Sequence, residues 1–304
     1  MSENSYSYWQ SYTFARMKKI LFALSTLFYF SANAQYNSLL WKISGNGLKE
    51  PSYLYGTMHT SDPRVFEVGD NASKYVLSSD AYAMELDPKE AFNLSMLGKM
   101  MMGKGYSLKK MIPEREYNLL DSIVKSEIGY SVTLFDNVAP VFTMTIFEAS
   151  AMELKGNDGD AKRDVLDLYF YKQAKKKKKK IIGIETVDEQ LGALNALSYQ
   201  EQADLLVKEI NEFEKNKNEG TDLVKFYLEQ NLDSLASNDV DMQMPEKFYK
   251  ALVTDRNVRM ADRIDVFIKE QPTFIAVGAL HLPSEKGVIE LLRKKGYKVE
   301  PERK

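Results

Sequence analysis

Short apolar runs separated by turn-forming residues predict the strands of this chain. Two runs within 39–56 flank a segment of Gly, Asn, Lys and Pro, which is the pattern of a β-hairpin. Three later runs, at 81–87, 179–186 and 273–281, are short and apolar, which is typical of buried strands. Each of these runs ends in acidic or histidine residues. A final run at 297–301 predicts a strand at the edge of the sheet.

The segments between these runs have the periodicity of amphipathic helices. The helix predicted at 113–129 begins with a proline and acidic residues and ends at Gly129, as expected from helix-capping preferences. The helix at 198–220 opens with Ser198 and Glu201, which form the pattern of a capping box. Further helices are predicted at 160–178, 244–271 and 284–296.

This alternation predicts an α/β fold, with a central mixed sheet flanked by helices. A helical insertion is expected near 90–170, where strand patterns are absent. No segment rich in Pro, Gly or Ser divides the chain, and no long internal repeat is visible. Residues 35–304 are therefore expected to form one domain.

The first 34 residues are expected to be absent from the mature protein. Met17 is followed by two lysines, an apolar stretch and small residues at Ala32 and Ala34, which is the layout of a secretory signal peptide. Cleavage after Ala34 would release an exported protein, periplasmic or extracellular. The alternative is an N-terminal membrane anchor, but the apolar stretch is too short to cross a bilayer comfortably. We therefore expect no stable membrane span.

Charge and cysteine content exclude some classes of partner and site. The chain has 41 basic and 43 acidic residues, and removing residues 1–34 leaves a net charge of −4. This weak acidity gives no basic face for nucleic acid, so no nucleic-acid partner is expected. The absence of cysteine excludes disulfides and thiolate metal sites.

Four apolar runs end in residues that can bind a metal. They lead to His59, Glu85, Glu185 and His281, and the two histidines are the only ones in the chain. Ligands bind beyond the carboxyl ends of parallel strands, so neighbouring parallel strands would bring these side chains together. Nitrogen and oxygen donors suit Zn²⁺, Mn²⁺, Fe²⁺ or Co²⁺.

Each histidine lies three residues after a glycine, at Gly56–His59 and Gly278–His281. We expect these glycines to allow a sharp backbone turn that points the imidazole back to the strand end. Two histidines and one carboxylate would leave open positions on the metal, and a second carboxylate could act as general base. The competing interpretation is that the acids cap the following helices and that the histidines are ordinary core or surface residues.

The predicted helix at 244–271 has an apolar face interrupted by Arg256. A guanidinium in this position must find a partner or reach a cleft. A carboxylate of the site or of a substrate is the natural partner, and the alternative is that Arg256 extends to the rim of the protein.

The chain resembles the TraB/GumN family, which includes the Tiki-like metalloproteases. The resemblance is carried by YLYGTMHTSDPRV, AMELD, VLDLYFYKQA, IETVDEQ, DRNVRMADRI and VGALH, in this order. It implies a sheet built from two related halves, each with one Gly-x-x-His motif, and metal-dependent peptide hydrolysis. The family positions that it places in the site are His59, Arg64, Glu85, Glu185, Arg256, Asn257 and His281.

The sequence therefore predicts an exported metal-dependent hydrolase, a peptidase with a peptide or protein substrate. His59, His281 and Glu85 are the expected ligands of a divalent metal (Mn, Co, Zn or Fe) that holds the attacking water. Glu85 and Glu185 remain interchangeable as ligand and base, while Arg256 and Asn257 are expected to hold substrate or oxyanion. The alternative is a non-catalytic protein that binds a peptide, haem or metal through the same histidines.

Overall fold

The computed structural model describes residues 36–60, 62–91, 94–147, 165–215, 222–241 and 244–302. The predicted signal peptide lies outside the described residues. Contacts divide the chain into Met1–Asn37 and Ser38–Lys304, and the second unit contains all the helices and strands described here. Within the described residues, none of the helices is both long enough and apolar enough to cross a membrane.

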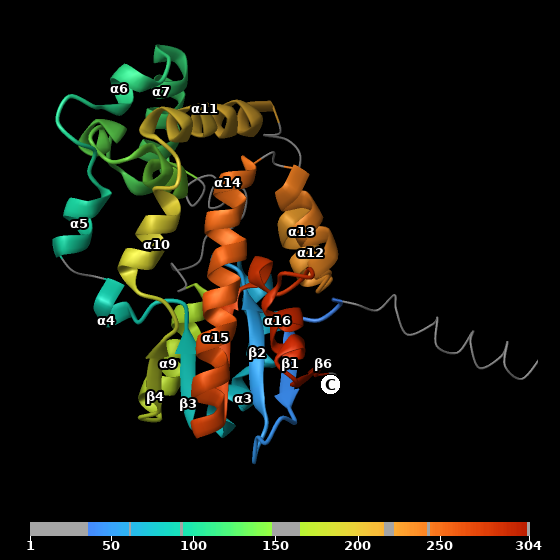
Figure 1. Cartoon of the computed structure of the whole chain (residues 1–304). Helices are drawn as coiled ribbons and strands as arrows, with labels where there is room; N and C mark the ends of the chain where they lie inside the picture. Colours follow the sequence, from blue (N-terminus) through green and yellow to red (C-terminus); the bar gives the residue numbers. More distant parts are fainter. Residues whose placement is uncertain are drawn as a thin grey trace, which may run out of the picture. The chain divides into compact units, whose positions relative to one another are not determined.

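A six-stranded mixed sheet forms the centre of this unit, which confirms the predicted fold class (Figure 1). Its spatial order is β4-β3-β5-β2-β1-β6. The four strands from β4 to β2 are parallel, while β1 pairs antiparallel with both β2 and β6. The strands are β1 (Leu40–Ser44), β2 (Ser52–Thr57), β3 (Ala81–Met84), β4 (Lys180–Gly183), β5 (Thr273–Gly278) and β6 (Lys298–Pro301).

The predicted hairpin and edge strand are both confirmed. Strands β1 and β2 pair with Leu40 opposite Tyr55, and their turn contains three consecutive residues with positive φ, Gly45, Asn46 and Gly47. These residue types tolerate the left-handed region, so the turn chemistry fixes the hairpin. Strand β6 pairs only with β1 and closes one edge of the sheet.

Buried aromatic rings pack across three neighbouring strands, β3, β5 and β2. Phe274 on β5 stacks with Tyr55 on β2 and with Tyr82 on β3, with ring centroids 6.2 and 6.3 Å apart. Phe170 packs edge-on against Phe274 from the helix layer, with centroids 5.3 Å apart. These rings bury one face of the parallel strands, and the polar residues lie at the carboxyl ends of the strands.

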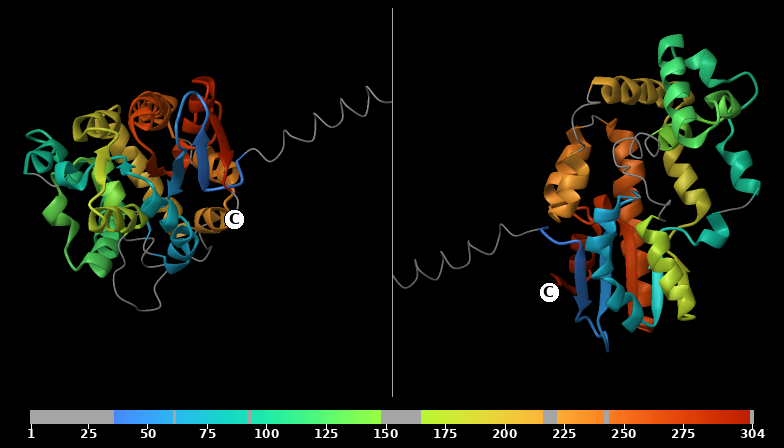
Figure 2. Two further views of the ribbon diagram at one scale, coloured as in Figure 1. Left: turned by 90° about the horizontal axis from the view of Figure 1, so that it is seen from below. Right: turned by 180° about the vertical axis from the view of Figure 1, so that it is seen from behind.

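Helices cover both faces of the sheet (Figures 1 and 2). One face carries α15 (Asp255–Glu270) and α16 (Val288–Lys294), and the other carries α2 (Pro63–Asp70), α3 (Ser73–Ser78) and α9 (Leu166–Lys176). Two further helices, α12 (Asp222–Leu228) and α13 (Leu232–Asp241), pack against each other.

A second hydrophobic core belongs to a helical region. This core joins part of the predicted insertion, through Leu120 and Phe142, to Leu206 and Phe248 far along the chain. The helical region is therefore larger than the insertion predicted at 90–170, of which 148–164 lies outside the described residues. Its elements include α5 (Leu94–Met100), α6 (Leu108–Met111), α7 (Glu114–Ile128), the 3-10 turn η1 (Val132–Phe135), α10 (Val187–Leu194) and α11 (Tyr199–Lys215). The short helix α4 (Pro88–Ala91) precedes them and contributes no residue to this core.

The helix caps agree with the sequence. Helix α7 ends at Gly129 with φ of 78°, the left-handed C-cap expected of glycine. At the start of α11, the Ser198 backbone N–H donates to Glu201 at 2.8 Å, and the Glu201 backbone N–H donates to the Ser198 hydroxyl at 3.4 Å. This reciprocal pair confirms the capping box.

The long helix predicted at 244–271 is interrupted. It consists of α14 (Glu246–Tyr249), a π-helical segment η2 (Lys250–Thr254) and α15. The Leu252 carbonyl in this segment accepts a hydrogen bond from Arg256 Nη1 at 3.1 Å. The π-segment therefore lies directly before the arginine that enters the site, a placement typical of functional regions.

Candidate functional site

Four ligand-type residues follow four adjacent parallel strands. In spatial order they are Glu185 after β4, Glu85 after β3, His281 after β5 and His59 after β2. The registers align these ends, because Met84 pairs with both Gly183 and Ala276, and Thr57 pairs with Gly278. The prediction that these strands are parallel neighbours is confirmed.

The two glycines serve close packing and not a special backbone angle, which corrects the sequence interpretation. Gly278 has φ of −52°, and neither Gly278 nor Gly56 is among the positive-φ residues. A Cβ at Gly56 would lie 3.0 Å from Ala279 Cα, and one at Gly278 would lie 3.3 Å from Glu85 Oε1. Gly56 thus lets the two histidine turns approach each other, and Gly278 lets the Glu85 carboxylate reach the backbone.

Asn257 sets the orientation of His281. The Asn257 amide group donates to the Lys286 carbonyl at 2.9 Å, so its oxygen faces His281 Nδ1 at 2.6 Å. His281 Nδ1 must therefore carry the proton, and its Nε2 presents a lone pair towards Glu85 Oε1, 3.8 Å away. Burial is the main cause that lowers the pKa of His281 to about 4, and so the imidazole is neutral at pH 7.

The two carboxylate oxygens of Glu85 accept hydrogen bonds from different partners. Oε1 accepts the Gly278 backbone N–H at 2.7 Å, and Oε2 accepts from Arg256 Nη2 at 2.7 Å and from Gln190 at 3.2 Å. Burial alone would raise the pKa of Glu85, but the charges of His281, Arg256 and His59, in this order, together with the Gly278 N–H, lower it to about 2. His281 acts on Glu85 as a charge only at acidic pH, where it is protonated; at pH 7 Arg256 is the cation that bonds to Glu85 directly.

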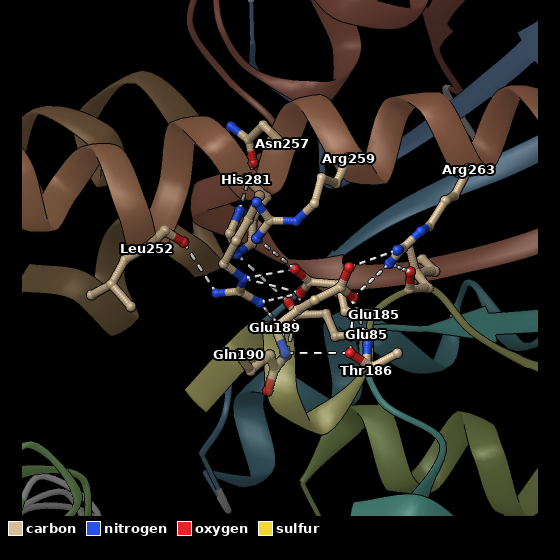
Figure 3. A network of polar contacts seen from close by, with 12 residues as sticks. Glu85, Glu185, Thr186, Glu189, Gln190, Leu252, Asn257, Arg259, Arg263 and His281 are labelled. Carbon is tan, nitrogen blue, oxygen red and sulfur yellow. Dashed lines mark hydrogen bonds and ion pairs between the residues drawn. The ribbon is translucent and has the colours of Figure 1, made fainter. Parts of the chain in front are cut away.

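Glu185 lies deeper and is enclosed by cations (Figure 3). Its side chain is 0% exposed, and Arg256 donates to it from Nε at 3.0 and 3.1 Å and from Nη2 at 2.6 Å. Arg259 Nη2 lies 3.8 Å from the same carboxylate. The expectation that Arg256 pairs with a carboxylate of the site is confirmed, with two such partners and not one.

His59 forms a pair with Asp167, a residue that the sequence analysis did not select. His59 Nε2 lies 3.3 Å from Asp167 Oδ2, and Asp167 Oδ1 accepts from the Thr57 hydroxyl at 2.7 Å. The Asp167 carboxylate raises the pKa of His59 to about 9, through hydrogen bonding and charge. The imidazole is 66% exposed, and so water screens part of this effect.

The sequence contained a weak signal for Asp167. It is an acidic residue in the first turn of α9, where acids are common because they favour the helix dipole. The Tyr82 hydroxyl donates a hydrogen bond to the Asp167 backbone carbonyl at 3.0 Å. This contact and the burial of Asp167 depend on tertiary packing. Periodicity could not show this contact.

Arg64 is not brought into this network. Its guanidinium is 62% exposed and donates to Asp62, the N-cap of α2, at 2.6 Å.

Asn257 is only 1% exposed, and its side chain is hydrogen-bonded within the protein. In the structure its contacts are to His281 and Lys286 and do not face solvent.

The site thus contains donors that suit a divalent metal, arranged as two pairs. His59 faces Asp167 on one side, and His281 faces Glu85 on the other. Among the described residues, no group of three His, Asp or Glu side chains is close enough to hold one ion. Arg256 and the Asp167–His59 contact satisfy the carboxylates separately, and this explains why the expected three-ligand cluster is not assembled.

Comparison with known proteins identifies the family. A sequence model of the TraB/PrgY/gumN family matches residues 39–301. The chain belongs to this family. Curated relatives of this TraB/PrgY/gumN member include metalloprotease TIKI1 of Danio rerio, 26% identical over 87% of this chain and 63% of its own length.

Other relatives are metalloprotease TIKI2 of Xenopus tropicalis, 26% identical over 87% of this chain and 60% of its own length, and human metalloprotease TIKI1, 25% identical over 88% and 62%. The chain therefore spans about three fifths of the length of these relatives. No solved structure matches the chain.

Proposed function

We propose that this TraB/PrgY/gumN protein is a metal-dependent hydrolase that cleaves peptide bonds. The observation that carries the proposal is that two histidines and two glutamates follow the carboxyl ends of four adjacent parallel strands. The relatives named metalloprotease TIKI1 and TIKI2 support the reaction class and a peptide or protein substrate.

The donor set fits a divalent ion. His281 is held as the neutral tautomer with Nε2 free, and this is the form that ligates a metal. The Asn257 contact is the outer hydrogen bond that fixes such a ligand. We assign His59, His281 and Glu85 as the ligands, and binding would have to draw His59 away from Asp167 towards the His281–Glu85 pair. A bound divalent ion would supply Lewis acidity towards a carbonyl group and activate water.

The two glutamates then have different roles. Glu85 is 16% exposed and faces His281, so it can reach a ligand in the site. Glu185 is 0% exposed and fixed by Arg256, so it acts by positioning that arginine and through it Glu85. Arg256 keeps Glu85 as a carboxylate, and Asn257 keeps His281 oriented.

The test is a chelator-reversible cleavage assay with protein spanning residues 35–304. The protein would be stripped of metal, incubated with a peptide library and analysed by mass spectrometry, with and without added Mn²⁺, Co²⁺ or Zn²⁺. Cleavage that returns with metal and is absent from His281→Ala supports the proposal. Metal binding without cleavage of any peptide would instead favour the non-catalytic binding protein.

We also propose that the protein is exported, on the basis of the segment from Met17 to Ala34. Mature protein should begin at Gln35 and be recovered outside the cytoplasm. N-terminal sequencing of protein from its native cells checks this. Retention of residues 17–34 on cytoplasmic protein would contradict it.

A further inference from the structure

We propose that Arg259 binds a carboxylate group of the peptide substrate, so that the protein prefers peptides with an acidic group near the cleaved bond. This inference rests on the proposed peptide hydrolysis and names a feature of its substrate. Three observations carry it: the position of Arg259 at the site, the unused hydrogen-bond donors of its guanidinium, and the charge balance of the residues around it.

Three arginines of α15 lie together at the strand ends. They occupy positions 256, 259 and 263, and spacings of three and four residues place them on one side of the helix. Arg256 and Arg259 both approach Glu185. Arg263, one turn further along, pairs with Glu189. Figure 3 shows the Arg259 side chain reaching from α15 towards the glutamates, so its guanidinium belongs to the wall of the site.

Two of these arginines are engaged within the protein. Every guanidinium nitrogen of Arg256 donates a hydrogen bond, to the two site glutamates or to the Leu252 carbonyl. Both terminal nitrogens of Arg263 donate as well, to Glu189 at 2.7 and 2.8 Å and to the Ile184 carbonyl at 2.6 Å. These two arginines therefore serve the protein itself, although the sequence pattern placed Arg256 on the substrate.

Arg259 differs from both. In the part of the chain that the structure describes, its guanidinium makes no hydrogen bond, and its Nη2 lies 3.8 Å from Glu185 Oε1, beyond hydrogen-bond distance. Arg256 and Gln190 already donate to the Glu185 carboxylate. Of the unbonded Arg259 nitrogens only Nε is buried, so the two terminal nitrogens are open to solvent, and the side chain is 35% exposed. Arg259 is thus held by charge and keeps donors for a ligand.

A carboxylate is the group that these donors fit. A guanidinium presents its N–H groups in a planar fork that matches the two oxygens of a carboxylate. The unpaired Nε shows that the protein does not fix the Arg259 guanidinium as it fixes that of Arg256, so the group can adjust to a ligand. In a peptide, the carboxylate belongs either to an Asp or Glu side chain or to the C-terminus. Both sources offer the same chemistry.

The charges around Arg259 permit an anionic ligand, because the acids of this ion-pair network each have a basic partner. The pairs are Arg256 with Glu85 and Glu185, His59 with Asp167, and Arg263 with Glu189. Arg259 is the additional cation beside the two glutamates that share Arg256. With His59 protonated, the network therefore carries no net negative charge that would repel a substrate carboxylate.

The bound carboxylate would belong to a residue near the cleaved bond. Arg256 Nη2 donates to Glu185 at 2.6 Å and to Glu85 at 2.7 Å, so a single guanidinium separates the partner of Arg259 from the assigned ligand Glu85. An extended peptide spans about 3.3–3.6 Å per residue. We therefore expect the acidic group within about three residues of the cleaved bond.

Peptide binding to the metal-free protein tests this inference without relying on cleavage. The probes are rhodamine-labelled hexapeptide pools of Ala, Ser and Leu, with one Glu at a varied position or Gln in its place, each with a free or an amidated C-terminus. Fluorescence polarisation gives the Kd of each pool for wild type, Arg259→Met, Arg259→Lys and Arg263→Met. Arg263→Met is the matched control, because this arginine lies on the same helix but is hydrogen-bonded to Glu189. Thermal melts confirm that each variant is folded.

We expect the wild type to prefer a carboxylate over its uncharged counterpart at least about fivefold. A preference for Glu over Gln identifies an acidic side chain, and a preference for the free over the amidated peptide identifies the C-terminus. Arg259→Met should reduce the preference to within about twofold. Arg259→Lys keeps the charge beside Glu185 and should retain part of the preference, and Arg263→Met should retain all of it.

Two results would overturn the inference while leaving the proposed function intact. One is a wild type that binds charged and uncharged pools equally, or binds none of them. The other is an unchanged preference in Arg259→Met. The same pools, incubated with protein loaded with Mn²⁺, Co²⁺ or Zn²⁺, test hydrolysis separately. If no pool is cleaved, the hydrolase proposal fails, and a preference that depends on Arg259 still establishes the carboxylate-binding site.

Discussion

Replacing Arg256 by methionine tests the charge arrangement at the centre of the site. Arg256 is 11% exposed and donates four hydrogen bonds to Glu85 and Glu185, at 2.6 to 3.1 Å. Methionine keeps most of the length but removes the charge, so both carboxylates lose their main buried cation. Removing one partner of a buried ion pair costs about 3–5 kcal/mol, because the remaining charge is uncompensated. We expect a loss of this size at pH 7, a decrease in Tm on the order of 10 °C.

The pH dependence gives the sign of this effect. In the wild type the pKa of Glu85 is lowered to about 2, so its contribution to stability is present above its ordinary pKa and is lost as the pH falls towards 2. Without Arg256, burial is opposed only by the two histidines and the Gly278 N–H, so the pKa of Glu85 rises and protonation relieves the variant on acidification. The stability difference between wild type and Arg256→Met should therefore shrink between pH 7 and pH 5.

Urea unfolding at several pH values measures this difference, and Arg263→Met is the control. Arg263 lies on the same helix and pairs with Glu189, but it is 41% exposed. Solvent screens this pair, so the control should lose only about 1 kcal/mol, with no pH trend attributable to Glu85. Equal losses in the two variants, constant from pH 7 to pH 5, would refute the buried ion-pair account.

Three further predictions concern the histidine turns. Asn257→Ala should destabilise the protein by about 2 kcal/mol in urea unfolding, because His281 Nδ1–H and the Lys286 carbonyl both lose their partner; full stability would contradict the tautomer assignment. Gly56→Ala should cost about 1–3 kcal/mol, since the new Cβ would lie 3.0 Å from Ala279 Cα; an unchanged Tm would mean that the two turns are not closely packed. The pKa of His281 is lowered to about 4 in the folded protein, so on acidification the unfolded state takes up this proton at a higher pH than the folded state. The free energy of unfolding of the wild type should therefore fall by up to about 3 kcal/mol from pH 6.5 to pH 4. His281→Ala should show a shallower pH dependence than the wild type, and an identical slope would show that His281 does not titrate in this way.

The sequence predicted the position of the site because its pattern is local. A polar residue directly after a buried apolar run lies at a strand end, and parallel pairing places such ends side by side. The hairpin turn, the Ser198–Glu201 capping box and the Gly129 C-cap are local in the same sense, and all are confirmed. The position of Arg256 on an otherwise apolar helix face predicted a carboxylate partner, and the structure shows two, Glu85 and Glu185.

The parts that the sequence did not predict depend on contacts between distant residues. Asp167 meets Thr57 across 110 positions, and a single acid in a helical first turn does not reveal such a contact. The role of Gly56 depends on Ala279, whose position is set by the β2–β5 register. The π-segment before Arg256 interrupts an amphipathic pattern that continues unbroken in the sequence, so periodicity predicts one helix there.

Metal content is the most direct test of the proposal that His59, His281 and Glu85, at three of the four strand ends, hold one divalent ion. Wild-type protein, His281→Ala and a control, Asp188→Asn, would be loaded with Mn²⁺, Co²⁺ or Zn²⁺, dialysed and measured by elemental analysis. Asp188 is a suitable control because its side chain is 72% exposed and pairs with Lys99. The account predicts one ion per chain in wild type and in Asp188→Asn, and loss of the ion in His281→Ala with the fold retained. Full occupancy in His281→Ala would contradict the account, because the ion would then be bound elsewhere in the protein.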